Sequence, residues 1–163
     1  MRIKNLWAVI LVIAALAGVS CASDNTQYGD LKFDYTTFKS EKSNWQALDI
    51  KDYTYEYYSA GFFYYHLLVE VEDGEYKNSS PLTNSELDIY TNTINDIYTK
   101  IESDYLSEKN KLRPDYELYL KEIDIEYDVD FHFPHKVSYI YHIPEGTEVD
   151  GNPWFRITNF TAN

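Results

Sequence analysis

Polar and apolar residues alternate strictly over two stretches of this chain, a period that is typical of half-buried β-strands. From Tyr53 to Tyr57 every second residue is tyrosine. From residue 121 to residue 131 the apolar members of the alternation are Ile123, Ile125, Tyr127, Val129 and Phe131. Such a strand places one face on a core and the other in solvent, as antiparallel sheets do. The alternation therefore predicts an antiparallel sheet.

Shorter patterns predict the remaining strands. We expect strands over residues 62–72, 136–143 and 154–161, so that the sheet has about five strands. In the first of these, Leu67, Val69 and Val71 share one face. Asp73-Gly74 closes that strand as a turn or bulge, after which residues 75–77 could continue the pairing.

Two segments have helical spacing instead. Phe38, Trp45 and Leu48 form one stripe within residues 31–48. A capping box over residues 83–86 predicts the start of a longer helix, which we expect to end near residues 109–111. Its apolar residues recur at steps of three and four: Leu87, Tyr90, Ile94, Ile97, Ile101 and Tyr105. Together the elements predict a two-layer α+β domain, an antiparallel sheet with two helices packed on one face.

The N-terminus has the layout of an export signal. Arg2 and Lys4 precede a wholly apolar run, and small residues lead to Cys21, which is the only cysteine of the chain. We expect residues 1–20 to be a signal peptide, residues 21–30 a lipid-anchored leash and residues 31–163 a single domain. Lipidation of Cys21 is one outcome; simple secretion and an uncleaved anchor are the alternatives, although the apolar run is shorter than the roughly 20 residues that span a bilayer.

Charge restricts the class of partner. Removing residues 1–20 takes away two basic residues and no acidic one, which changes the formal net charge from −13 to −15. Such a surface repels nucleic acid and anionic lipid headgroups, and it favours cations or a basic protein partner. The 17 tyrosines, 8 phenylalanines and 3 tryptophans supply enough core material to exclude a disordered chain.

The same alternation places five carboxylates on the polar face of the strand over residues 119–131: Glu122, Asp124, Glu126, Asp128 and Asp130. Neighbouring carboxylates on one strand face lie about 6.8 Å apart, which is too far for two of them to chelate one ion well. The row is either a solvated face or a binding face for a cation or a basic partner.

His132 and His135 flank a Phe-Pro pair at a turn, with Asp130 nearby. Two histidines and a carboxylate are a zinc ligand set, while surface turn histidines are the alternative. His66 and His142 are expected on polar strand faces. The sequence contains no glycine-rich phosphate loop, nucleophile elbow or zinc-protease helix, so it predicts no catalytic residue, metal site or cofactor.

Several short motifs carry a resemblance. The first half comprises Trp45, the segment from Tyr53 to Tyr57, Val69-Glu-Val71 and Asp73-Gly74. The second half comprises Tyr127-Asp128, Phe133-Pro134, Val137-Ser-Tyr139 and Phe155-Arg-Ile157. Over residues 44–160 the chain resembles a family of small exported bacterial lipoproteins known only as a domain of unknown function. The resemblance implies a cellular location and a fold class, and no activity.

These observations predict an extracytoplasmic, membrane-anchored lipoprotein with a non-enzymatic binding or interaction domain. Its lipid would anchor the domain in a membrane, and the outer membrane is favoured if the cell has one. Secretion is the alternative. Its other partner would be a basic protein or another component of the cell envelope. Two further functions stay open: a metal-dependent or carboxylate hydrolase that uses His132, His135 and Asp130, and a secreted inhibitor that presents the acidic strand to a basic enzyme.

Overall fold

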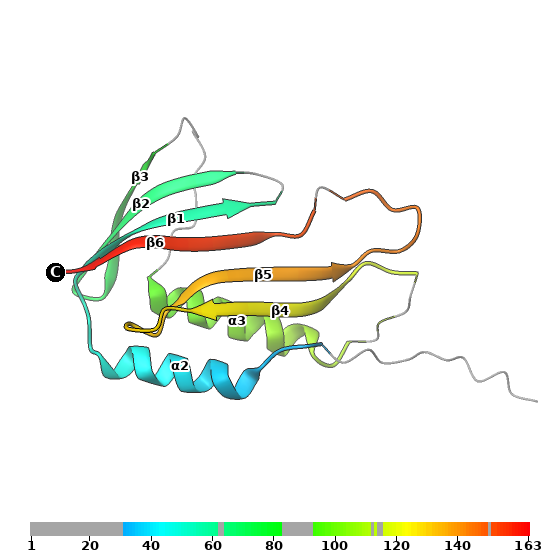
Figure 1. The fold of residues 1–163 in the computed structure, drawn as a ribbon, viewed down its shortest axis with the longest axis horizontal. Coiled ribbons are helices and arrows are strands. Elements are labelled where there is room, and N and C mark those ends of the chain that lie inside the picture. The colour runs from blue at the N-terminus through cyan, green and yellow to red at the C-terminus, as the bar shows by residue number, and fades with distance from the viewer. Residues whose placement is uncertain (1–30, 62–63, 83–92, 112, 114–115, 150) are drawn as a thin grey trace, which may run out of the picture.

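The computed structural model describes residues 31–61, 64–82, 93–111, 113, 116–149 and 151–163. Within them the chain forms an α+β fold with the elements shown in Figure 1: α2 (Tyr35–Ala47), β1 (Tyr53–Ala60), β2 (Tyr65–Glu72), β3 (Glu75–Pro81), α3 (Ile94–Glu108), β4 (Tyr119–Tyr127), β5 (Pro134–His142) and β6 (Trp154–Ala162). The signal peptide, Cys21, the leash and the capping box expected over residues 83–86 lie outside the described residues.

The strands form one antiparallel sheet in the order β3-β2-β1-β6-β5-β4. The last strand of the chain is therefore inserted between β1 and β5, which brings residues about 100 positions apart in the sequence into direct pairing. The sheet has six strands where the sequence predicted five, because the pairing after Asp73-Gly74 continues to Pro81 as β3. Six of the seven residues of β3 are exposed and one is partly buried, so no apolar alternation marked this edge strand.

The β2–β3 hairpin depends on a residue that tolerates positive φ. Asp73 has φ 53° and Gly74 has φ 77°. Two central residues with positive φ are characteristic of the tight hairpin turn whose twist matches that of the strands. Gly74 donates its N–H to the carbonyl of Lys51 at 2.9 Å, and the N–H of Asp73 bonds the Asp52 carboxylate at 2.7 Å, so the turn is also tied to the start of β1.

Both helices begin at side-chain caps. Asp34 accepts the N–H of Thr37 at 2.9 Å and caps α2. Thr93 accepts the N–H of Asp96 at 3.1 Å while the Asp96 carboxylate accepts the N–H of Thr93 at 3.0 Å, which is a reciprocal capping box. Thr93 has an extended backbone with φ −60° and ψ 163°, so the predicted helix does not run unbroken from Leu87 into α3, which begins at Ile94. Its predicted end near residues 109–111 is confirmed.

Alternation along the strands defines two faces of the sheet. The inner face carries the buried strand residues Tyr53, Tyr55, Leu67, Val69, Val71, Ile123, Val137 and Ile157. The outer face carries the strand residues between them, which are Thr54, Glu56, Tyr58, His66, Leu68, Glu70, Glu122, Asp124, Glu126, Lys136, Ser138, Ile140, Trp154, Arg156 and Thr158. The prediction that Leu67, Val69 and Val71 share one face of their strand is confirmed.

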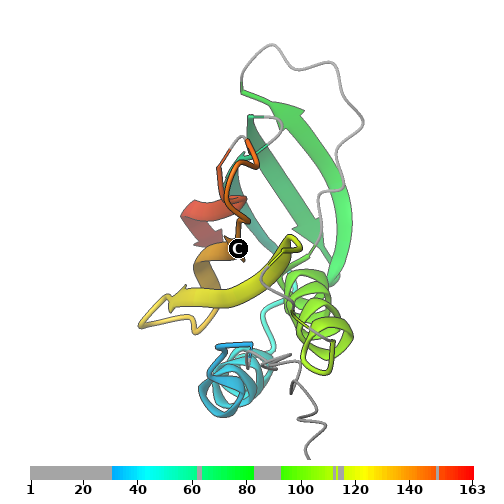
Figure 2. The ribbon, with the colours of Figure 1, turned by 90° about the vertical axis from the view of Figure 1, so that its right-hand side faces the viewer.

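The helices contact inner-face residues. Trp45 of α2 lies edge-on to Tyr53 at 5.6 Å and to Phe160 at 5.9 Å between ring centroids. The Tyr53 hydroxyl in turn accepts the N–H of Ile94, the first residue of α3, at 2.9 Å. Phe38 and Tyr98 join the two helices through an edge contact at 5.4 Å, and Figure 2 shows α2 and α3 lying beside each other near β4. No helix in the described ranges is long and apolar enough to cross a membrane.

Candidate functional site

The outer face contains a hydrogen-bonded network centred on Glu56. Its carboxylate accepts the side-chain amide N–H of Asn159 and the hydroxyl of Tyr58, each at 2.9 Å, and lies 2.9 Å from Nε2 of His66. Hydrogen bonds from Asn159, His66 and Tyr58 lower the pKa of Glu56 below its ordinary value. Glu56 therefore stays ionised at neutral pH, in a network that spans β1, β2 and β6.

A bulge in β6 positions the amide of this network. Thr54 pairs with Thr161 but Glu56 pairs with Thr158, so β6 has one more residue than β1 across this interval. Asn159 lies in the interval with φ 51°, a conformation that asparagine tolerates better than most residues. Such bulges re-aim side chains. Here the bulged residue reaches Glu56 on the neighbouring strand.

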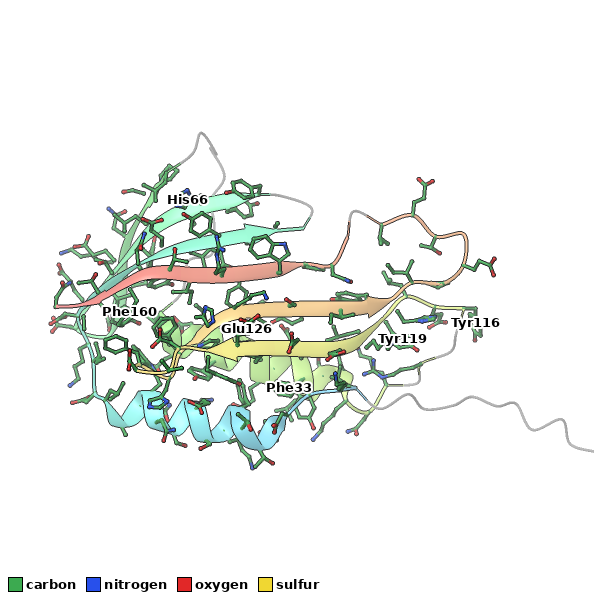
Figure 3. The ribbon with its side chains drawn as sticks, viewed as in Figure 1. Phe33, His66, Tyr116, Tyr119, Glu126 and Phe160 are labelled. Atoms are coloured by element: carbon green, nitrogen blue, oxygen red, sulfur yellow. The ribbon has the colours of Figure 1, made fainter. Side chains whose placement is uncertain are left out.

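The centre of the face is a row of cross-strand neighbours. Tyr58 pairs with His66 on one side and with Arg156 on the other, and Arg156 pairs with Lys136, which pairs with Glu126. Figure 3 labels His66 on β2 and Glu126 on β4, at the two ends of this row. One row thus crosses five strands and includes two adjacent cations.

Aromatic stacking fixes the middle of the row. The rings of Tyr58 and His66 stack with centroids 3.9 Å apart, and the Arg156 guanidinium lies over the Tyr58 ring at 5.1 Å. Arg156 is exposed, and no carboxylate in the described part of the chain lies within ion-pair distance of it. The ring contact with Tyr58 orients this exposed guanidinium, which no carboxylate of the described residues neutralises.

Trp154 extends this centre along β6. It pairs with Ala60 on β1 and with Ser138 on β5, so two small residues flank its ring on the outer face. It lies two residues before Arg156 and therefore on the same face of the strand. We call Tyr58, Trp154 and Arg156, with the exposed Leu68 beside Glu56, the outer-face cluster.

The predicted acidic row is shorter than the alternation implied. β4 ends at Tyr127, so Asp128 and Asp130 lie in a turn and the prediction that all five carboxylates share a strand face is wrong. The reason is local hydrogen bonding: the Asp128 carboxylate accepts the N–H groups of Asp130 at 3.0 Å and Phe131 at 2.8 Å. An aspartate that binds its own following backbone favours a turn over a continued strand.

Two of the three remaining carboxylates are neutralised within the molecule. Glu122 forms an ion pair with Lys32, and Glu126 forms one with Lys136. The hydrogen bond from Lys136 lowers the pKa of Glu126, so this carboxylate stays charged and paired. Asp124 is exposed and forms no ion pair in the described residues. The acidic row therefore has a smaller net negative charge in the folded domain than its sequence alone suggests.

The two histidines predicted at a turn are separated: His132 precedes β5, whereas His135 is the second residue of β5. Nδ1 of His132 lies 2.8 Å from the Glu41 carboxylate on α2, whereas Nε2 of His135 lies 3.6 Å from Glu126 on β4. His132 also has φ 61°, and its carbonyl accepts the Tyr98 hydroxyl, which ties this turn to α3. Among the described residues, Asp130 forms no ion pair with either imidazole. In the described ranges, no three histidine, cysteine, aspartate or glutamate side chains converge as a metal-binding group.

Sequence reasoning missed the outer-face cluster. In the sequence, Arg156 stands out only within the Phe155-Arg-Ile157 motif, and no pattern singles out Tyr58. The available signal was the strand phase, which put each residue on the polar face. Their meeting depends on the pairing of β1 with β6, which neither strand's sequence encodes by itself.

Comparison with models of protein families, with curated proteins and with solved structures finds no match for this chain. The resemblance to small exported lipoproteins accordingly stays a prediction.

Proposed function

We propose that this chain is a non-enzymatic binding domain, exported and tethered to the cell envelope through a lipid on Cys21. In this proposal both helices pack on the inner face of the sheet as one layer, and the outer face is left open for a partner. The leash over residues 21–30 would give the domain reach from the membrane. The export signal in the sequence and the chemistry of the outer face support this function.

One observation carries the proposal: a tyrosine, a tryptophan and an arginine lie on the same polar face of the sheet, and the arginine contacts the tyrosine ring. Tyr58 and Arg156 are paired across β1 and β6, and Trp154 lies on the same face of β6. These three residue types dominate the energetics of protein interfaces, where a few central residues contribute most of the affinity. Glu56, with its three hydrogen-bonding neighbours, holds Tyr58 in place and so preorganises the cluster.

The alternatives have less support from the geometry. The hydrolase would need His132, His135 and Asp130 to act together, but the two histidines face different carboxylates, and Asp130 forms an ion pair with neither among the described residues. The inhibitor would need a uniformly acidic strand, but Lys32 and Lys136 neutralise two of its three carboxylates. The following test distinguishes recognition by the acidic strand from recognition by the outer-face cluster.

The test is chemical crosslinking in intact cell envelopes, followed by quantification of the captured components. Wild type is compared with a Trp154→Ala/Arg156→Ala variant. The matched control is Leu106→Ala/Lys109→Ala, which removes an exposed apolar residue and an exposed cation from α3. We expect the outer-face variant to lose at least about tenfold in the yield of one component, because each hot-spot side chain contributes about 2 kcal/mol or more. The control should capture that component like wild type.

A third variant addresses the acidic row. It carries amides in place of Glu122, Asp124, Glu126, Asp128 and Asp130. If this variant loses the component and the outer-face variant keeps it, recognition belongs to the acidic row and the proposal is wrong. Equal capture by all variants would also contradict it. Each variant's unfolding curve is measured first, so that a loss of capture is assigned only to folded protein.

A further inference from the structure

β4 is an edge strand of the sheet, and only part of its free edge is paired. Along the edge that faces away from β5, β4 forms a single parallel bridge, between Lys32 and Glu122. Two backbone hydrogen bonds make this bridge: Lys32 donates to the carbonyl of Lys121, and Ile123 donates to the carbonyl of Lys32, each at 3.0 Å. Beyond Ile123 the chain before α2 turns away into the helix that begins at Tyr35.

The bridge reveals which backbone groups of β4 point outward. Ile123 directs its N–H away from β5, and alternation along a strand gives Ile125 and Tyr127 the same direction. Asp128 lies out of phase with them and donates its N–H inward, to the carbonyl of Phe133 at 2.9 Å, which agrees with this assignment. In the described part of the chain, no backbone group bonds the N–H groups of Ile125 and Tyr127 on this edge.

A groove lies beside these two residues. It has a volume of about 230 Å³ and is lined by Lys32, Phe33, Asp34, Thr37, Glu122, Ile123, Asp124, Ile125 and Tyr127. Figure 3 shows Phe33 beside β4, just before α2. Ile125 and Tyr127 are only partly buried there. The volume is below the roughly 300–1,000 Å³ of cavities that hold drug-sized ligands, so it suits a short stretch of extended chain better.

The groove is negatively charged. The Asp34 carboxylate lies at its helix end, and hydrogen bonds from Thr37 lower the pKa of Asp34, so it stays ionised. Asp124 lines the strand side and is exposed, while Lys32 is already paired with Glu122. A neutral or acidic segment would leave these carboxylates without a counter-charge. A segment that carries lysine or arginine would match them.

We propose that the free edge of β4, from Ile125 to Tyr127, binds an extended basic segment of a partner protein by strand addition. The partner's backbone would bond the outward groups of Ile125 and Tyr127, and its basic side chains would face Asp34 and Asp124. Strand addition supplies affinity through main-chain hydrogen bonds and specificity through alternate side chains. This site lies at the sheet edge, so it is separate from the outer-face cluster and does not depend on it.

The test uses a blocked hexapeptide of alternating lysine and valine and reads backbone hydrogen exchange residue by residue. We expect the peptide to slow exchange at Ile125 and Tyr127 by about tenfold or more, because both N–H groups gain an acceptor. Two control peptides should give no protection: one with glutamate in place of lysine, and one that is N-methylated at every backbone nitrogen, so that neither of its edges can pair. Protection by the N-methylated peptide, or protection confined to the outer face, would overturn the proposal.

A pair of variants tests the charge. Asp34→Asn/Asp124→Asn removes both carboxylates while asparagine keeps an acceptor for the cap of α2. We expect it to weaken binding of the lysine peptide by about tenfold. The control is Asp49→Asn/Asp73→Asn, two exposed aspartates with φ 50° and 53° where asparagine is also tolerated. Equal affinity of the two variants, or no binding by wild type, would contradict strand addition by a basic segment.

Discussion

Replacing Trp45 with alanine is expected to lower the free energy of unfolding by about 3–5 kcal/mol, the range for truncating a buried large aromatic residue. Trp45 is 2% exposed. Its ring lies edge-on to Tyr53, Phe133 and Phe160, with centroids 5.6, 6.3 and 5.9 Å away. The variant would therefore remove the side chain that joins α2 to β1, to β6 and to the turn before β5.

The measurement is urea unfolding followed by circular dichroism, and the control is the same substitution at Trp154. Trp154 lies on the outer face and is only partly buried, so its loss should cost less than half as much. A loss at Trp154 equal to that at Trp45 would contradict the assignment of inner and outer faces. A loss at Trp45 below about 1 kcal/mol would contradict its place in the core.

Alkaline pH should unfold the domain cooperatively, and this is the second large effect. Burial raises the pKa of Tyr53 and of Tyr57 to about 12. Burial also raises the pKa of four further tyrosines, namely Tyr55, Tyr98, Tyr127 and Tyr139. In the unfolded chain all of these phenols ionise near pH 10.

Because the folded state raises these tyrosine pKa values, folding stability decreases as pH rises. A folded-state pKa above the unfolded value means that the folded state keeps its protons longer. The stabilisation is complete below about pH 10 and is lost as pH rises from about 10 to 12. Each buried tyrosine costs up to about 1.4 kcal/mol per pH unit in that window. Together these tyrosines oppose a folding stability that is usually about 5–15 kcal/mol, so the domain should unfold within or just above this pH window.

Tyrosinate absorbance and circular dichroism, recorded together during a pH titration, check this prediction. The buried tyrosines should ionise in one step with unfolding. Tyr57→Phe should make the loss of stability with pH shallower, by up to about 1.4 kcal/mol per pH unit. Full ionisation near pH 10 with the fold intact would show that the tyrosines are not buried.

How much of the fold was predictable depends on how strongly each element is patterned. β1 and β2 have apolar alternation and were located within a few residues, and β6 was located in the same way. β3 has no such alternation because it is an exposed edge strand, and it was missed as a full strand. The capping box at Thr93 was missed because an equally good motif, over residues 83–86, occurs just before it.

The site was less predictable for a different physical reason. The acidic row could be predicted because its residues alternate within one short stretch of sequence. The turn at Asp128 shortens this row, and Lys32 and Lys136 neutralise two of its carboxylates. The pairing of Tyr58 with Arg156 joins residues about 100 positions apart, so no local pattern marks it. The lesson is that strand phase tells which face a residue occupies, whereas strand order decides which residues meet there.

Cysteine labelling in intact envelopes tests the central claim most directly. Leu68 on the outer face is 40% exposed and Leu106 on α3 is 45% exposed, so Leu68→Cys and Leu106→Cys form a matched pair. Cys21 is the only native cysteine, and wild type sets its background. Labelling rates are compared between purified folded domain and intact envelopes. We predict that the envelope protects the thiol of Leu68→Cys and leaves that of Leu106→Cys equally reactive. Equal rates at Leu68→Cys in both settings, or protection at Leu106→Cys alone, would contradict recognition through the outer face.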